Sequence, residues 1–171
     1  MDFQQLIKDR FSVRKFAPTP IEEEKLTTIL EAAQVAPTAC NNQPQRIYVL
    51  KSKEALTKIS SVVKYIFNAP LVFMICVNED VSWKNSRDAG YSSGEMDASI
   101  VCTQMMLQAQ ALGLGSLWIR GYATEDVTRL FPLPLGERLV CLLAVGYAAP
   151  DAKPAPYHTK REPLENIVRF L

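Results

Sequence analysis

The sequence predicts an α+β domain in which helices surround one mixed sheet of four or five strands. Two stretches, residues 70–78 and 138–148, are apolar at almost every position, which is typical of strands covered on both faces. Helical and extended patterns are interleaved along the chain rather than segregated into halves. The 171 residues are enough for one domain, residues 1–171, that buries a single core.

Two helices are predicted before the first strand. Apolar residues recur at helical spacing over residues 3–10, which indicates a short amphipathic helix that ends near the first arginine. A second helix is expected over residues 20–35. Thr19 is its candidate cap, Pro20 suits the first helical position, and Glu22 completes a capping box.

The later elements alternate between apolar strands and helices. The predicted strands are 46–50, 70–78, 115–119 and 138–148, and the predicted helices are 51–66, 95–113 and 125–131, with Thr124 as the cap of the last helix. The helix over 95–113 is apolar nearly all round, so we expect it to be buried centrally. The polar segment 81–94 reads as a loop over a site or an interface, too short for a large lid. The proline-rich tail from residue 150 has no core of its own and is expected to cross the surface of something else.

The composition excludes several classes of protein. Lys and Arg together number 19 against 18 Asp and Glu, so no long-range positive field is available to hold a nucleic acid. The longest apolar runs are too short to span a bilayer, so no membrane partner is expected. The first ten residues lack the order of a secretory signal, and the four cysteines form no CxxC pair. We therefore expect a cytoplasmic protein with reduced thiols.

Side chains able to perform acid–base or nucleophilic chemistry are sparse. His158 is the only histidine, and Cys40 could act as a nucleophile with it only if another group oriented the imidazole. One histidine and no paired acidic motif leave too few ligands for a metal site. The chain has neither GxGxxG after a strand nor GxxxxGK[ST], so neither a Rossmann nucleotide site nor a phosphate-cradling P-loop is indicated.

A basic cluster near the start admits two interpretations. The stretch RFSVRKF carries Arg10, Ser12 and Arg14, and a second basic pair, Lys160 and Arg161, lies far away in the sequence. Each group by itself is typical of a solvated charged surface. If the two groups converge, their donors suit a phosphate monoester, because arginine presents a fork of N–H groups and serine a hydroxyl.

Four blocks in one order resemble the FMN-dependent nitroreductase family. They are R-x-S-x-R-x-F at 10–16, A-P-T-A-x-N-x-Q-P at 36–44, L-G-L-G-S-x-W-I at 112–119 and K-R-x-P-L-E-x-I-V at 160–168. The resemblance implies a nitroreductase-like fold and an intertwined homodimer with two FMN sites at the subunit interface. It also implies ping-pong transfer of hydride from NAD(P)H through flavin N5 to a nitroaromatic, a quinone or a similar acceptor, with no catalytic side chain. The alternatives are other flavin chemistry on the same fold, such as reductive dehalogenation or flavin breakdown, and flavin binding without turnover.

The resemblance also assigns the cofactor-binding residues. Arg10, Lys160 and Arg161 are expected at the phosphate with Ser12, and Arg14 there or at the pyrimidine edge of the flavin. The other expected contacts are Pro37, Thr38, Ala39, Asn41 and Gln43 from the partner chain, and Ile119, Arg120 and Gly121 along the ring, with a backbone N–H directed towards N5. The chain departs from the common family pattern at Phe11, Thr38, Gln45 and Arg120, and Arg120 is the departure expected to affect substrate preference.

Overall fold

A computed structural model of the chain describes residues 2–171. Ten helices and strands alternate along these residues. They are α1 (Phe3–Asp9), α2 (Glu23–Gln34), β1 (Gln45–Leu50), α3 (Lys53–Val62), β2 (Leu71–Asn78), α4 (Gly94–Ala111), β3 (Gly115–Ile119), α5 (Thr124–Leu130), β4 (Glu137–Gly146) and α6 (Leu164–Ile167). Two short 3-10 turns, η1 (Ala39–Asn41) and η2 (Lys64–Ile66), complete the order. The α+β class and the four central strands predicted from the sequence are confirmed.

The four strands form one sheet in the order β1-β2-β4-β3, and every neighbouring pair is antiparallel. The prediction of a mixed sheet is therefore wrong for the named strands. The chain reverses between α3 and η2, so it leaves β1 and enters β2 at the same end of the sheet, where Leu50 pairs with Val72. In residues 2–171 the only parallel pairing is an isolated bridge between Ser12 and Ser116.

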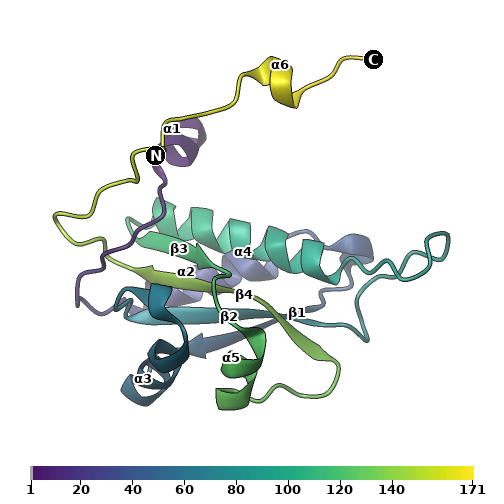
Figure 1. The fold of residues 1–171 in the computed structure, drawn as a ribbon, viewed down its shortest axis with the longest axis horizontal. Helices are drawn as coiled ribbons and strands as arrows, with labels where there is room; N and C mark the ends of the chain where they lie inside the picture. The colour runs from purple at the N-terminus through teal and green to yellow at the C-terminus, as the bar shows by residue number, and fades with distance from the viewer. Residues whose placement is uncertain (1) are drawn as a thin grey trace.

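Helices cover both faces of the sheet (Figure 1). Along β2, Phe73 and Ile75 belong to the core beneath α2 and α4, whereas Met74 and Cys76 belong to the core beneath α3 and α5. All four side chains are fully buried. The interpretation of residues 70–78 as a strand covered on both faces is thus confirmed, and the alternation of a strand explains it.

Some element boundaries differ from the sequence prediction. Helix α2 begins at Glu23 rather than at residue 20, and Thr19 does not cap it. The carboxylate of Glu22 instead accepts a hydrogen bond from the hydroxyl of Tyr147, at 2.9 Å, so the expected capping box is replaced by a contact to the end of β4. Helix α5 includes Thr124, which therefore is not the cap of that helix.

Helix α4 is buried on one side only. Its inner residues, including Val101 and Met105, lie fully buried against the sheet. On the outer side Met96 remains 56 % exposed and Ile100 37 % exposed. The prediction of a centrally buried helix therefore holds for the inner side of α4 and is wrong for its outer side, which stays partly exposed.

The C-terminal tail leaves the body of the molecule. It runs past α1 and ends in α6, away from the sheet (Figure 1). Residues 159–171 are all exposed, and Phe170 is 97 % exposed. No helix within residues 2–171 has both the length and the apolar character required to cross a membrane.

The segment that follows α1 is attached to the edge of the sheet. The backbone N–H of Val13 donates to the carbonyl of Ser116 at 3.0 Å, and the N–H of Ala17 donates to the carbonyl of Tyr147 at 2.8 Å. Gly115 permits this close approach, since a Cβ there would lie 2.5 Å from Cγ2 of Val13. The absence of a side chain at the start of β3 thus positions the basic N-terminal segment.

We expect Gly115→Ala to lower the free energy of unfolding by about 1–3 kcal/mol, the usual cost of overpacking a filled site. Urea denaturation would measure this cost. The same change made beside Val13→Ala should cost less, because the two methyl groups nearest the new Cβ are then gone. An equal cost in both backgrounds would show that Val13 is not the obstacle.

Candidate functional site

Arg10 and Arg161 come from opposite ends of the sequence but lie near enough for their charges to interact. Arg10 follows the last turn of α1 and is half-buried. Burial lowers the pKa of Arg10 from its ordinary value, and the neighbouring positive charge of Arg161 lowers it further. None of the ion pairs formed within residues 2–171 involves either arginine. The result is a positively charged position that no protein carboxylate neutralises, as an anion-binding site requires.

The tail is attached beside Arg10 through an aromatic contact. The rings of Phe11 and His158 meet edge to face, with their centroids 6.2 Å apart. The guanidinium of Arg161 donates hydrogen bonds to the carbonyls of His158 and Lys160, the latter at 2.8 Å. Phe11, for which the sequence offered no role, therefore contacts the segment that carries Arg161.

The other polar residues of this cluster have different surroundings. Ser12 is half-buried beside β3, and Arg14 is exposed and donates to the carbonyl of Ser12 at 3.3 Å. Lys15 forms an ion pair with Asp151, so it belongs to the attachment of the tail. Lys160 is exposed. We call Arg10, Ser12, Arg14, Lys160 and Arg161 the clamp. The structure brings the N-terminal residues of the clamp near the tail segment that carries Lys160 and Arg161.

The end of β3 places three further candidates near the N-terminal segment. Ile119 is buried, so its side chain contributes to the core. The guanidinium of Arg120 lies 5.1 Å from the centre of the Tyr122 ring, in an exposed position. A Cβ on Gly121 would lie 3.1 Å from the ring of Tyr65. The glycine therefore has a packing role, and Tyr65 is a neighbour that the sequence did not indicate.

The loop over residues 37–43 has a backbone shape that is unusual for side-chain-bearing residues. Cys40, Asn41 and Gln43 all have positive φ, at 51°, 54° and 50°. The hydroxyl of Thr38 accepts a hydrogen bond from the N–H of Gln43 at 3.1 Å, which closes the loop on itself. We call this segment the amide loop. Asn41, Asn42 and Gln43 are exposed, although the side-chain amide of Asn42 already donates to the carbonyl of Val81 at 3.0 Å.

A buried carboxylate anchors the amide loop to α4. Asp97 is 2 % exposed, and its Oδ1 accepts from the N–H of Ala39 at 2.9 Å. Its Oδ2 accepts from the hydroxyl of Ser93 at 2.7 Å. Sequence reasoning missed Asp97. The available signal was an acidic residue in the first turn of a helix, four positions after a serine.

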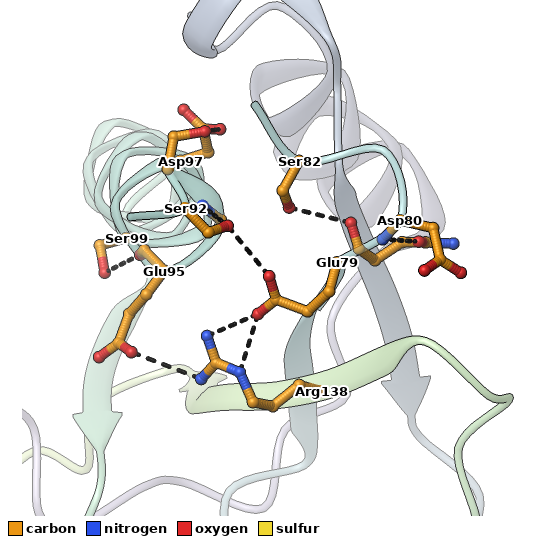
Figure 2. Close-up of polar contacts among 11 residues, drawn as sticks. Glu79, Asp80, Ser82, Ser92, Glu95, Asp97, Ser99 and Arg138 are labelled. Carbon is orange, nitrogen blue, oxygen red and sulfur yellow. Dashed lines mark hydrogen bonds and ion pairs between the residues drawn. The ribbon is translucent and has the colours of Figure 1, made fainter. Parts of the chain in front are cut away.

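The segment between β2 and α4, residues 79–93, forms an arm whose base is fixed by charges (Figure 2). Glu79 accepts from Nε of Arg138 at 2.9 Å and from the hydroxyl of Ser92 at 3.0 Å. Arg138 also reaches Glu95 on α4, at 3.4 Å. This network joins β4, the arm and the start of α4. The arm and the amide loop enclose a recess of about 240 Å³.

The clamp and the amide loop lie at opposite ends of α4. The loop is bound to the first turn of the helix through Asp97, whereas Ser12 pairs with Ser116, beyond the last turn. The 18 residues of α4 span about 27 Å at the rise of an α-helix. The two groups of candidate residues therefore do not meet within one chain.

A cavity of about 870 Å³ lies elsewhere. It is bounded by the start of α2, by α3 and by the residues that lead into β2, and none of the predicted site residues lines it. Cavity size alone would therefore have directed attention away from the paired arginines. Cations without a carboxylate partner point to a ligand, whereas the volume of a cavity alone does not.

The pair of Cys40 and His158 considered from the sequence does not form. Cys40 belongs to the amide loop and His158 to the tail beside Phe11, so α4 separates them. Burial is the main cause that raises the pKa of Cys76 to about 12, which keeps this thiol protonated and inert at neutral pH. The positions of these groups offer no support for thiol catalysis.

Comparisons of the sequence and of the structure with known proteins give one consistent result. The sequence model of the Nitroreductase family matches residues 7–66 and 61–147. A Methanothermobacter thermautotrophicus protein named NADH dehydrogenase/NAD(P)H nitroreductase is 31% identical over 156 residues, which cover 87% of this chain and 78% of that protein. A nitroreductase family protein from Clostridium difficile superposes with a TM-score of 0.92 at 36% identity, covering 99% of this chain and 98% of that chain. An FMN-dependent nitroreductase of the same species has a TM-score of 0.73 at 26% identity, with coverage of 92% and 96%.

We expect Asp97→Ala to lower the free energy of unfolding by about 2–3 kcal/mol, because it leaves the N–H of Ala39 and the hydroxyl of Ser93 without their acceptor. Asp97→Asn should cost less, since one amide oxygen remains to accept from Ala39. Glu95→Ala, two positions away, removes an exposed ion pair and should cost about 0.5 kcal/mol or less. Chemical denaturation of the three variants checks the order, and equal costs for Asp97→Ala and Glu95→Ala would contradict the anchoring role.

Proposed function

The chain belongs to the nitroreductase family, and from this premise we propose that it is an NAD(P)H-dependent FMN oxidoreductase acting on nitroaromatics, quinones or similar acceptors. The proposed turnover is ping-pong, with NAD(P)H and the acceptor using the same face of the flavin in succession. The cytoplasmic location and the absence of nucleic-acid and membrane partners stay predictions from the sequence.

The pairing of Arg10 with Arg161 is the observation that carries this proposal. Burial is the main cause that lowers the pKa of Arg10, and repulsion by the neighbouring guanidinium of Arg161 lowers it further. A phosphate monoester reverses this repulsion and accepts hydrogen bonds from both planar forks. Lys160, exposed and adjacent to Arg161 in the sequence, and Ser12, two positions after Arg10, carry further donors. The donor set therefore fits the phosphate of FMN.

The rest of the clamp and the end of β3 suit the ring system of FMN. When bound, FMN supplies the hydride chemistry at N5. The backbone at Ile119, Arg120 and Gly121 is the segment proposed to offer an N–H towards that atom. Arg14 is exposed, and we propose that its positive charge favours negative charge on the pyrimidine edge of the flavin. The protein's share is placement and electrostatics, so a missing acid–base pair is consistent with the chemistry.

The separation of the clamp from the amide loop points to a shared site. We propose that Pro37, Thr38, Ala39, Asn41 and Gln43 of one chain complete the flavin site of the other. The outer side of α4 is apolar and unpartnered, with Met96 and Ile100 exposed, as expected of a surface that a second copy covers. Symmetry would then place two equivalent sites at one isologous interface.

The tail supports the intertwined form of this homodimer. Leu164, Ile167 and Phe170 project from a segment that nothing covers within residues 2–171. Strand β1 lies at the edge of the sheet and offers unpaired backbone groups, and a groove of about 390 Å³ runs between this strand and α2. We propose that the tail of each chain passes over the partner along this edge.

The purified protein should be yellow and should bleach when NADH or NADPH is added without oxygen, because reduction removes the visible absorption of the flavin. Colour should return when menadione or nitrofurazone is added. A colourless protein that does not take up added FMN would refute the proposal. Flavin that binds but is reduced by neither nicotinamide would indicate a different flavin chemistry on the same fold.

A heterodimer of two damaged chains should recover activity if the site is shared. One chain carries Arg10→Ala with Arg161→Ala, and the other carries Asn41→Gly with Gln43→Gly, where glycine tolerates the positive φ. Each homodimer should be nearly inactive. The heterodimer, purified through two different tags, then holds one intact and one doubly damaged site, which gives about half of the wild-type rate per dimer. An inactive heterodimer would mean that each site belongs to one chain.

A further inference from the structure

We infer that the contact between Phe11 and His158 is a positioning device that holds Arg161 opposite Arg10 in the clamp. This inference rests on the proposed function, because it assigns the two residues to the binding of the flavin phosphate. Neither ring has a donor or a charge that the proposed reaction uses. Their effect is transmitted through the backbone of the tail to the guanidinium of Arg161.

The contact is the last fixed point of the tail before its basic residues. Further back, the tail is attached through the N–H of Ala149, which donates to the carbonyl of Lys15 at 3.0 Å, and through the ion pair of Lys15 with Asp151. His158 is half-buried, whereas every residue from 159 to 171 is exposed. Beyond His158, therefore, no packing against the body of the molecule determines where the chain goes.

Short-range hydrogen bonds carry the position of His158 forward to Arg161. The N–H of His158 donates to the carbonyl of Ala155 at 2.8 Å, and the N–H of Lys160 donates to the carbonyl of Tyr157 at 3.1 Å. The guanidinium of Arg161 donates to the carbonyl of His158 itself. The segment from 155 to 161 is thus a pair of turns that moves as a unit with the imidazole ring.

The opposite half of the contact belongs to the body of the molecule. Phe11 is half-buried and packs against the core on the α3 and α5 side of the sheet. It is adjacent to Arg10, so a single dipeptide provides both the anchor for the tail and one cation of the clamp. The ring of Phe11 and the guanidinium of Arg10 are therefore carried by neighbouring residues of the same segment.

An apolar anchor is needed because charge alone would separate the two arginines when no anion is bound. Arg10 and Arg161 repel one another in that state, and neither has a carboxylate partner within residues 2–171. An edge-to-face aromatic contact is attractive whatever the charge state of the ligand. By keeping Arg161 near its working position, it reduces the fraction of molecules that must reorganise before the phosphate binds.

The experiment compares the affinities of the apoprotein for FMN and for riboflavin, measured by quenching of flavin fluorescence. Riboflavin lacks the phosphate, so the dissociation constant of riboflavin divided by that of FMN measures the contribution of the clamp. This quotient is called the ratio below. We expect Phe11→Ala and His158→Ala each to reduce this ratio about 3- to 10-fold by weakening FMN binding alone, as expected when the competent state becomes less populated. Arg161→Ala should reduce it further, and Phe11→Ala should add nothing in the Arg161→Ala background.

Two controls separate positioning from general damage. Tyr157→Ala removes an exposed aromatic ring next to His158 and should leave the ratio unchanged. Phe11→Tyr keeps the ring edge and should restore the wild-type ratio. Because His158 lies in the tail, His158→Ala tests the contact even if Phe11→Ala destabilises the core.

Each outcome decides something different. If Phe11→Ala and His158→Ala weaken FMN and riboflavin equally, or neither, the positioning role is wrong while the proposed function stands. If the wild-type protein binds riboflavin as tightly as FMN, or if Arg161→Ala keeps the preference for FMN, then no clamp exists and the inference fails with it. Binding of neither flavin would overturn the proposed function itself.

Discussion

The pairing of β2 with β4 is the constraint on which the rest of the molecule depends. Both strands are central in the sheet and apolar on both faces, so each must be covered by helices on two sides. No polar group that serves a ligand can be accommodated there. Functional residues are therefore confined to the segments at the edges and ends of the sheet. The clamp lies beside the edge strand β3, and the amide loop precedes the opposite edge strand β1.

The distribution of ion pairs separates structural cations from those available to a ligand. Lys15 has Asp151, Lys51 has Glu23, and Arg138 has two carboxylates, so the chain supplies an acid where a cation serves the fold. Within the part of the chain that the structure describes, Arg10 and Arg161 form no such pair. With a net charge of only +1, the protein does not gain this site from an overall excess of positive charge. The site arises because two basic segments converge and form no ion pair with a carboxylate within residues 2–171.

The two halves of the proposed flavin site share one helix and yet cannot meet on it. Asp97 binds the amide loop to the first turn of α4, and the clamp lies beyond its last turn. The rigidity of a long helix keeps the halves apart, and the same helix presents an apolar outer side to a second chain. If the apolar side of α4 packs against a second chain, the clamp of each chain can meet the amide loop of the other and complete the site. This is the physical reason to expect function from the pair of chains rather than from one.

Hydrophobic patterning alone was sufficient for the α+β class and for the strands near 46–50, 70–78, 115–119 and 138–148, because burial on a sheet imposes a local pattern on each strand. The sequence did not show whether neighbouring strands pair parallel or antiparallel, because this depends on the end of the sheet at which each connection brings the chain back. The same limit explains the misplaced start of α2, where Tyr147, remote in sequence, takes the carboxylate of Glu22. The sequence blocks at 10–16 and 160–168 indicated Arg10 and Arg161 as candidate cofactor-binding residues. Only the tertiary structure brought the charges of the two arginines near each other, placed the Phe11 ring against His158 and showed that Asp97 anchors the amide loop. Each of these contacts joins segments that are far apart in the sequence, so no local pattern encodes it.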